Sequence, residues 1–322
     1  MPQVNKNITA LCRNLNFGAL SLDEKLTGWQ RAFNDEITLL CRGLPASQQA
    51  SALMFLMRYS GITIGAEMNF FKNYYHPSWT ILAHVVKKSG GGKPENFPHF
   101  IRAHAMAMFL HSLEDHMTDA EIRTDNLTLL LHGEAWRRYR NSLDQVCGDD
   151  QNLKEVVDTH LDRYFSSIGT NPEDETLEGY CDHFRDQMAT TTLVVSLLAI
   201  KTPFAGQKTG HIIKAFECFG IAWRLLDDLN DLEKDIPDGT KSALYYLLEE
   251  QWRNLYDLQE SPRDSEEILK YLAAAGTLKK ALLLTINFLD RGAEAAGSAG
   301  ITLYKSELTQ LSEPLRKAGE SL

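Results

Sequence analysis

Apolar residues recur every three or four positions along almost the whole chain, which is the spacing of one face of an α-helix. No segment alternates apolar and polar residues in the way that predicts a β-strand. Turn-forming residues at 89–94, 171–172 and 237–239 interrupt the pattern. The segments that we expect to be helical are 5–17, 21–41, 45–62, 63–74, 78–88, 98–119, 125–146, 151–168, 173–201, 207–234, 241–259, 263–290 and 302–319.

These segments predict an all-α protein. No linker divides the chain, so we expect residues 1–322 to form a single domain. Several of the segments are long enough to pack as a bundle of helices around a central apolar cavity.

Composition narrows the classes of function that fit this fold. A hydrophobic fraction of 43% is enough for a large core, and a net charge of −10 argues against a nucleic-acid partner. The five cysteines show no CxxC spacing, which is typical of reduced thiols in a cytoplasmic protein. The longest apolar run, residues 190–200, is too short to span a bilayer, and the N-terminus lacks the pattern of a signal peptide.

The stretch from Phe219 to Asp231 ends an apolar helical run with three carboxylates, Asp227, Asp228 and Asp231. Asp227 and Asp231 are four residues apart, so on a helix they project from one face. Like charges at this spacing destabilise a helix. A hard divalent cation is the simplest partner that would offset the repulsion.

Residues 114–119 form another acidic cluster, the first of the two along the chain, which ends the apolar run that precedes it. Asp115 and Asp119 repeat the spacing of four residues. A lone cluster of this kind is most often a solvated helix end, but the repetition favours two clusters that face each other across the mouth of a cavity. Carboxylates in such an arrangement favour Mg²⁺ completed by substrate phosphates, and the metal would neutralise charge on a leaving group.

Other metal and nucleotide sites do not fit the sequence. A di-iron carboxylate bundle needs Glu-x-x-His, and no histidine has a glutamate three residues before it. The glycine and the closing glutamate of an EF-hand are misplaced around residues 227–238. No HExxH, Walker A, GxSxG or GxGxxG pattern is present.

Basic residues flank the second cluster. Arg224 precedes Asp227 by about one turn, and Lys241 follows the turn at Gly239. Each could pair with a neighbouring acid, but their place inside the motif favours contact with a phosphate group. For Lys234 we favour the ion pair.

The stretch from Phe219 to Asp231 resembles the second aspartate-rich motif of the trans-prenyltransferases, the isoprenyl diphosphate synthases. The family pattern is Gly-x-Ala-Phe-Gln followed, three residues later, by Asp-Asp-x-x-Asp. Residues 238–242 are similar to the family's Gly-Lys-Thr segment, and residues 115–119 to its first Asp-Asp-x-x-Asp motif, with His in the second place. Tyr180 and Gln187 have the spacing of the family's Tyr…Lys-Thr-Ala helix. The resemblance covers about residues 90–260.

This resemblance implies the class I isoprenoid synthase fold, an all-α bundle with a deep apolar pocket. In the family, three Mg²⁺ held by the two motifs bind an allylic diphosphate. Ionisation of its C–O bond gives an allylic cation and pyrophosphate, and an alkene or another nucleophile attacks the cation. The family also implies a homodimer.

The departures from the family fall on the side of the second substrate, isopentenyl diphosphate. Gln187 stands where the family has Lys, and Arg224 where it has Gln. No Arg-Arg-Gly follows the first motif, where Arg123 is the nearest basic residue, and residues 91–93 only faintly echo the family's Gly-Gly-Lys-Arg. An arginine at 224 could supply the positive charge that is lost at 187.

On this basis we assign the candidate site residues. The metal ligands are Asp115, Asp119, Asp227, Asp228 and Asp231, of which Asp115 and Asp227, together with Lys241, form the catalytic set. The substrate-binding residues are Arg224, Lys241, Gln187, Phe184, Leu110 and His111, the last two lying where this fold sets the depth of its pocket.

Three hypotheses follow. The first is a Mg²⁺-dependent prenyltransferase that uses isopentenyl diphosphate or an unusual acceptor. The second is a terpene cyclase on a C15 or C20 diphosphate, which needs no isopentenyl site and therefore suits Gln187. The third is a non-catalytic subunit of a heteromeric synthase, against which the five aspartates argue.

Overall fold

The chain is all-α in the computed structural model, which describes residues 10–63, 65–90, 96–202, 208–259 and 261–320. Within these ranges there is no β-strand, as the sequence predicts. The helices are α2 (Glu24–Arg42), α3 (Ala46–Tyr59), η1 (Phe70–Asn73), α4 (Pro77–Lys88), α5 (Phe97–Thr118), α6 (Asn126–Cys147), α7 (Gln151–Ser167), α8 (Leu177–Gln187), α9 (Ala189–Lys201), α10 (Thr209–Asn230), α11 (Leu232–Asp238), α12 (Ala243–Tyr246), α13 (Glu250–Asp257), α14 (Pro262–Ala274), α15 (Thr277–Ala299) and α16 (Thr302–Gly319).

Several segments predicted as one helix are two. The segment 173–201 breaks at Met188, where the carbonyl accepts hydrogen bonds from both the backbone N–H (3.1 Å) and the hydroxyl (2.9 Å) of Thr191. A threonine hydroxyl that competes for a backbone carbonyl in this way disturbs the helical pattern. The segment 263–290 breaks before Gly276, which has a φ of +68° that other residues rarely adopt.

Four further predictions of helix extent are wrong. The segment 207–234 divides at Asp231 into α10 and α11, and the segment 241–259 divides into α12 and α13. In the segment 63–74, of which residue 64 is not described, the only helix among the described residues is the 3₁₀ helix η1. Of the predicted helix 5–17, residues 10–13 are helical, and residues 1–9 lie outside the described part of the chain.

The chain groups into two compact units, each described here by itself. One unit comprises residues 21–165 and 188–213, where α5 packs against α2, α6 and α9. Its core is aromatic: Phe33 lies 5.3 Å from Phe71 and 5.9 Å from Trp79, measured between ring centroids. All three side chains are fully buried, so this cluster anchors α2, η1 and α4 to one another.

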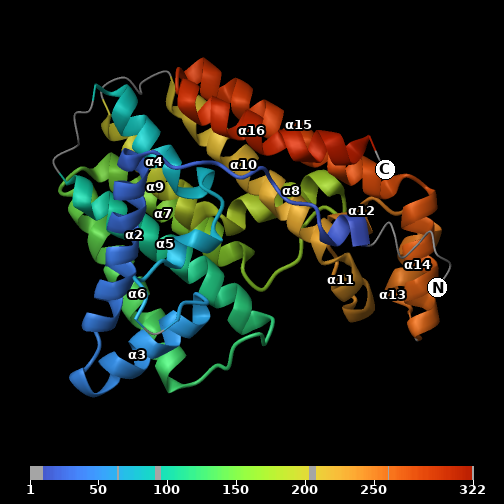
Figure 1. The fold of residues 1–322 in the computed structure, drawn as a ribbon, viewed down its shortest axis with the longest axis horizontal. Coiled ribbons are helices and arrows are strands. Elements are labelled where there is room, and N and C mark those ends of the chain that lie inside the picture. Colours follow the sequence, from blue (N-terminus) through green and yellow to red (C-terminus); the bar gives the residue numbers. More distant parts are fainter. Residues whose placement is uncertain (1–9, 64, 91–95, 203–207, 260, 321–322) are drawn as a thin grey trace. The chain divides into compact units, whose positions relative to one another are not determined.

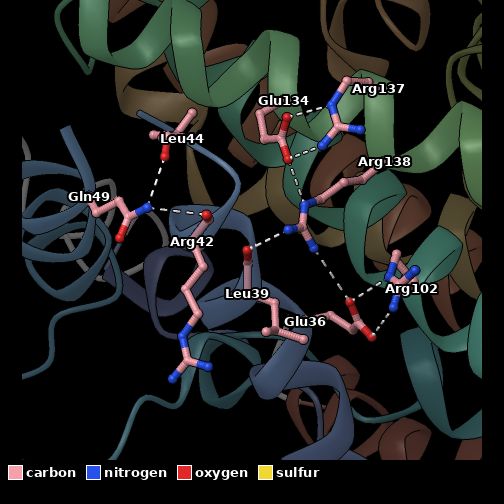
Figure 2. A network of polar contacts seen from close by, with 9 residues as sticks. All are labelled: Glu36, Leu39, Arg42, Leu44, Gln49, Arg102, Glu134, Arg137 and Arg138. Carbon is pink, nitrogen blue, oxygen red and sulfur yellow. Dashed lines mark hydrogen bonds and ion pairs between the residues drawn. The ribbon is translucent and has the colours of Figure 1, made fainter. Parts of the chain in front are cut away.

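Figure 2 shows a network of polar contacts within the same unit. Arg102 donates from Nε to Glu36 Oε2 at 2.9 Å, and Arg138 donates to Glu134 at 2.8 Å and to the Leu39 carbonyl at 2.6 Å. Arg137 adds two hydrogen bonds to the same Glu134. The network joins α2, α5 and α6. Glu36, Glu134 and Arg138 are largely buried, and removing one partner of a buried ion pair is costly, whereas Arg137 is 56% exposed.

The other unit comprises residues 1–20, 166–187 and 214–322. Within it α15 and α16 run side by side (Figure 1). A Cβ at Gly292 of α15 would lie 3.1 Å from Leu308 and 3.2 Å from the Ala215 carbonyl, so the glycine permits close packing of the helices. No single helix in the described ranges is long and apolar enough to cross a membrane; α14 and α15, bent by 63°, meet that test only as a pair.

Candidate active site

The second acidic cluster lies at the end of α10, and two of its carboxylates reach solvent. The Asp227 side chain is 40% exposed, and Asp231 is exposed as well. Although α10 ends at Asn230, the Asp231 N–H still donates to the Asp227 carbonyl at 2.9 Å. The backbone therefore keeps the two residues one helical turn apart, as the spacing predicts.

Asp228 differs from its neighbours because it is buried, with a side chain only 2% exposed. Its Oδ2 accepts hydrogen bonds from the Tyr180 hydroxyl (2.7 Å) and from the Ala243 N–H (2.9 Å). Its Oδ1 lies 3.1 Å from Arg224 Nε. Both oxygens of this carboxylate thus have donors from the protein itself, which a buried charge requires.

Arg224 belongs to the same network. Its Nε also donates to the Tyr180 hydroxyl at 2.8 Å, and its guanidinium lies 5.8 Å from the centroid of the Phe184 ring. Burial, and then the charge of Asp228, holds the pKa of Tyr180 well above its usual value. Tyr180 therefore stays protonated and passes a hydrogen bond from the arginine to the carboxylate.

One acid of α11 has an unusual proton affinity. Burial, helped by the charge of Asp228, raises the pKa of Asp235 from 3.8 to about 7. A carboxyl group at this value is poised between its two forms near neutral pH. The sequence did not single out this residue, because its spacing from Asp231 is that of any solvated helical acid.

Lys241 has two polar partners, Tyr245 and Asp257. Its Nζ donates to the Tyr245 hydroxyl at 3.1 Å and lies 3.1 Å from Asp257 Oδ1. The hydrogen bond with Tyr245, and then that with Asp257, raises the pKa of Lys241, so the ammonium is fully charged. Its side chain remains 37% exposed.

The first acidic cluster lies at the end of α5, where Asp115 and Asp119 are exposed. The Asp119 N–H donates to the Asp115 carbonyl at 2.9 Å, which matches the arrangement in α10. His116, in the place of the family's second aspartate, lies 2.7 Å from the Tyr59 hydroxyl through Nδ1. This contact ties the end of α5 to α3.

Glu114 has a role that the sequence did not reveal. Its Oε1 accepts hydrogen bonds from His132 Nε2 at 2.6 Å and from Trp136 Nε1 at 2.9 Å, and its Oε2 accepts one from the Tyr164 hydroxyl. Burial alone would raise the pKa of Glu114, but these hydrogen bonds hold it below its usual value. Glu114 thereby fastens the end of α5 to α6 and α7.

The predicted substrate-binding residues have different surroundings. Leu110 is fully buried in α5, and His111 is half-buried. Phe184 is buried beside Arg224, and Gln187 lies 3.2 Å from His183, between Nε2 atoms. Their contacts with a substrate stay a prediction, and residues 91–93 lie outside the described part of the chain.

The donor set of each acidic cluster suits a hard cation. Each cluster offers two exposed carboxylates one helical turn apart, and oxygen ligands of this kind are those that Mg²⁺ prefers. In the described ranges no three His, Cys, Asp or Glu side chains come close enough to hold a metal ion. The two clusters belong to different compact units.

Comparison with solved structures shows which fold this is. The structure aligns with a geranylgeranyl pyrophosphate synthetase from Geoglobus acetivorans at a TM-score of 0.66 and 13% identity, covering 90% of this chain and 100% of that one. A decaprenyl diphosphate synthase from Rhodobacter capsulatus gives 0.64 at 14% identity, with 92% and 97% covered. The chain has the fold of the isoprenyl diphosphate synthases.

A third protein of this fold was solved with ligands. It is a polyprenyl synthase from Caulobacter crescentus complexed with calcium and isoprenyl diphosphate, with a TM-score of 0.64 at 12% identity over 89% of this chain and 94% of that one. A scan of protein-family models finds no match, and a search of curated proteins finds no similar sequence. The isoprenyl diphosphate synthase fold is therefore shared at a low level of sequence identity.

Proposed function

We propose that this protein is a Mg²⁺-dependent prenyltransferase of the cytoplasm that ionises an allylic isoprenyl diphosphate. The observation that carries the proposal is the end of α10. There Asp227 and Asp231 reach solvent, whereas the buried carboxylate of Asp228 pairs with Arg224. This arrangement occurs in a chain with the fold of the isoprenyl diphosphate synthases. A protein of that fold has been solved with calcium and isoprenyl diphosphate.

In the proposed reaction the C–O bond of the allylic diphosphate breaks, and its electron pair leaves with pyrophosphate. The π electrons of the acceptor then form the new bond to the allylic carbon, and a proton is lost from the acceptor. Bound Mg²⁺ would neutralise the charge that develops on the leaving group. We assign Asp115, Asp119, Asp227 and Asp231 to holding the metal.

Lys241 is the residue that we propose to contact the diphosphate. Its ammonium is charged and partly exposed, and it is held in place by Tyr245 and Asp257. A cation with a fixed position can stabilise the departing pyrophosphate without first being ordered.

A terpene cyclase is the second candidate, and the surroundings of Gln187 favour it. The family's Lys at this place is replaced by an amide that contacts His183. A cyclase has no need of isopentenyl diphosphate, because a double bond of the substrate itself attacks the cation. The same acidic clusters would serve both reactions.

We further propose that the protein is a homodimer. Leu129 and Leu130 of α6 are 51% and 41% exposed, and Phe165 of α7 is 47% exposed. Phe165 also stacks on Trp136 of α6, with ring centroids 5.4 Å apart. Exposed large apolar side chains occur in protein–protein contacts, and sedimentation of the purified chain would test for a dimer.

One assay separates the candidate functions. The protein is incubated with Mg²⁺ and a C10, C15 or C20 allylic diphosphate, with and without isopentenyl diphosphate, and pyrophosphate and products are measured. Longer diphosphates formed only with isopentenyl diphosphate support the prenyltransferase. Cyclic hydrocarbons or alcohols formed without it support the cyclase, and no pyrophosphate in any mixture leaves a prenyltransferase with an unusual acceptor or a non-catalytic subunit.

A further inference from the structure

The buried Arg224–Asp228 pair sets the second acidic motif apart from the family pattern. Where the family has a glutamine four residues before the second aspartate, this chain has an arginine that lies 3.1 Å from Asp228. Tyr180 completes the arrangement, because its hydroxyl accepts from Arg224 (2.8 Å) and donates to Asp228 (2.7 Å). We call these three residues the arginine lock.

The lock takes Asp228 away from the metal-binding surface. Its carboxylate is 2% exposed, and both oxygens already have donors on the protein. A metal ion bound directly to Asp228 would have to displace the arginine or the tyrosine and enter a buried place. Asp227 and Asp231, by contrast, are open to solvent.

The same geometry argues against Arg224 as a ligand of the diphosphate. Its Nε is engaged by Tyr180 and Asp228, its side chain is only 26% exposed, and it lies over the Phe184 ring. Its Nη1 lies 3.9 Å from Asp227 Oδ2, within reach of the Coulomb field of that carboxylate.

We infer that Arg224 is a positioning residue that neutralises Asp228 and so leaves the second motif with two metal-binding carboxylates, Asp227 and Asp231. The inference rests on the proposed function and specifies its metal site. The lock also helps to position Lys241, the proposed contact of the diphosphate. Asp228 accepts a hydrogen bond from the N–H of Ala243, which lies two residues after Lys241. One buried carboxylate thus connects the end of α10 to the start of α12.

The test uses the full chain and Mn²⁺ as the probe for Mg²⁺, with free Mn²⁺ measured by EPR at a fixed concentration of inorganic pyrophosphate. Arg224→Gln removes the compensating charge, so we expect it to bind Mn²⁺ roughly tenfold more tightly even though its Tm falls. Arg224→Lys keeps the charge and is expected to bind within about twofold of the wild type. Loss of structure alone would weaken binding, so the sign of the change distinguishes the lock from a purely structural role.

The double variant R224Q/D228N decides whether Asp228 is a ligand. It restores the charge balance of the wild type, so the lock predicts wild-type affinity for Mn²⁺. A loss of tenfold or more in the folded double variant, or weaker binding by Arg224→Gln, would overturn the inference. Asp227→Asn serves as the separate control of the proposed function: if it binds Mn²⁺ as the wild type does, the metal site itself is wrong.

Discussion

The hydroxyl of Tyr245 donates a hydrogen bond to Oδ2 of Asp257, 2.9 Å away, and both residues hold the ammonium of Lys241. Asp257 is 12 residues after Tyr245 and lies on a different helix, α13 rather than α12. Tyr245 and Asp257 therefore hold the Lys241 ammonium in place beside the second acidic motif even when no substrate is bound.

We predict that Asp257→Asn weakens binding of the allylic diphosphate modestly. The Lys241–Asp257 pair is partly exposed, so its contribution is at most about 1 kcal/mol, or roughly fivefold in KM. Lys241→Ala should raise KM further and lower kcat, because it removes the cation itself. Steady-state kinetics of both variants check this, and a wild-type KM in Lys241→Ala would remove the lysine from the site.

Asp227→Ala should lower turnover by roughly a hundredfold or more. It removes a proposed ligand of the Mg²⁺ that would neutralise the charge developing on the departing pyrophosphate. The Asp227 side chain is half in solvent, so the helical circular dichroism and the Tm should stay close to those of the wild type. Pyrophosphate release measures the activity. Wild-type turnover in the folded variant would show that Asp227 is not part of the metal site.

Glu114→Gln should lower stability by about 2–3 kcal/mol, because it weakens three partly buried hydrogen bonds to a charged acceptor. The pKa of Glu114 lies below its usual value in the folded state, so its contribution is complete above the unfolded pKa of 4.5 and is lost as the pH falls below it. Denaturant unfolding from pH 7 to pH 3 should therefore show wild type and variant converging. Equal stabilities at pH 7 would contradict the prediction.

Gly43→Ala should destabilise the protein by about 2–3 kcal/mol, since a Cβ there would overlap Glu134 Oε1. Glu134 has little freedom to move, because Arg137 and Arg138 both bind it. Gly133→Ala in α6 is the matched control: a Cβ there meets nothing within 4 Å, so the change should stabilise the helix by about 0.5–1 kcal/mol. A similar effect of the two substitutions would show that the network in Figure 2 can rearrange.

Asp235→Asn should stabilise the metal-free protein at pH 8. The folded pKa of about 7 lies above the ordinary 3.8, so the folded state favours the protonated acid, and stability falls as the pH rises from 3.8 to 7. The group is partly exposed, which limits the gain from the neutral amide to about 1–2 kcal/mol. Unfolding in the presence of EDTA measures it; the difference should shrink towards pH 4, and its persistence there would indicate another cause.

The periodicity of apolar residues predicts the helices that carry the acidic motifs because those helices are long and mostly buried. The end of α5 at Thr118 and the start of α16 at Thr302 agree closely with the sequence. The sequence does not predict the break at Met188 because no glycine or proline stands near it, and only the hydroxyl of Thr191 reveals the competition for the carbonyl.

The burial of Asp228 could have been read from the sequence. Cys218, Ile221, Leu225 and Asp228 follow one another at spacings of three and four residues, so the aspartate continues a buried face of α10. The partners of Glu114 could not have been predicted from the sequence. His132 and Tyr164 lie 18 and 50 residues away, and local periodicity does not indicate contacts over such separations.

The contacts of Glu114 have a consequence for the energetics of ligand binding. Asp115, the first acid of its motif, directly follows Glu114, whose side chain is already held by α6 and α7. The last turn of α5 therefore has little conformational entropy left to lose when a metal or a diphosphate binds. Such a preorganised carboxylate lets more of the binding free energy appear as affinity.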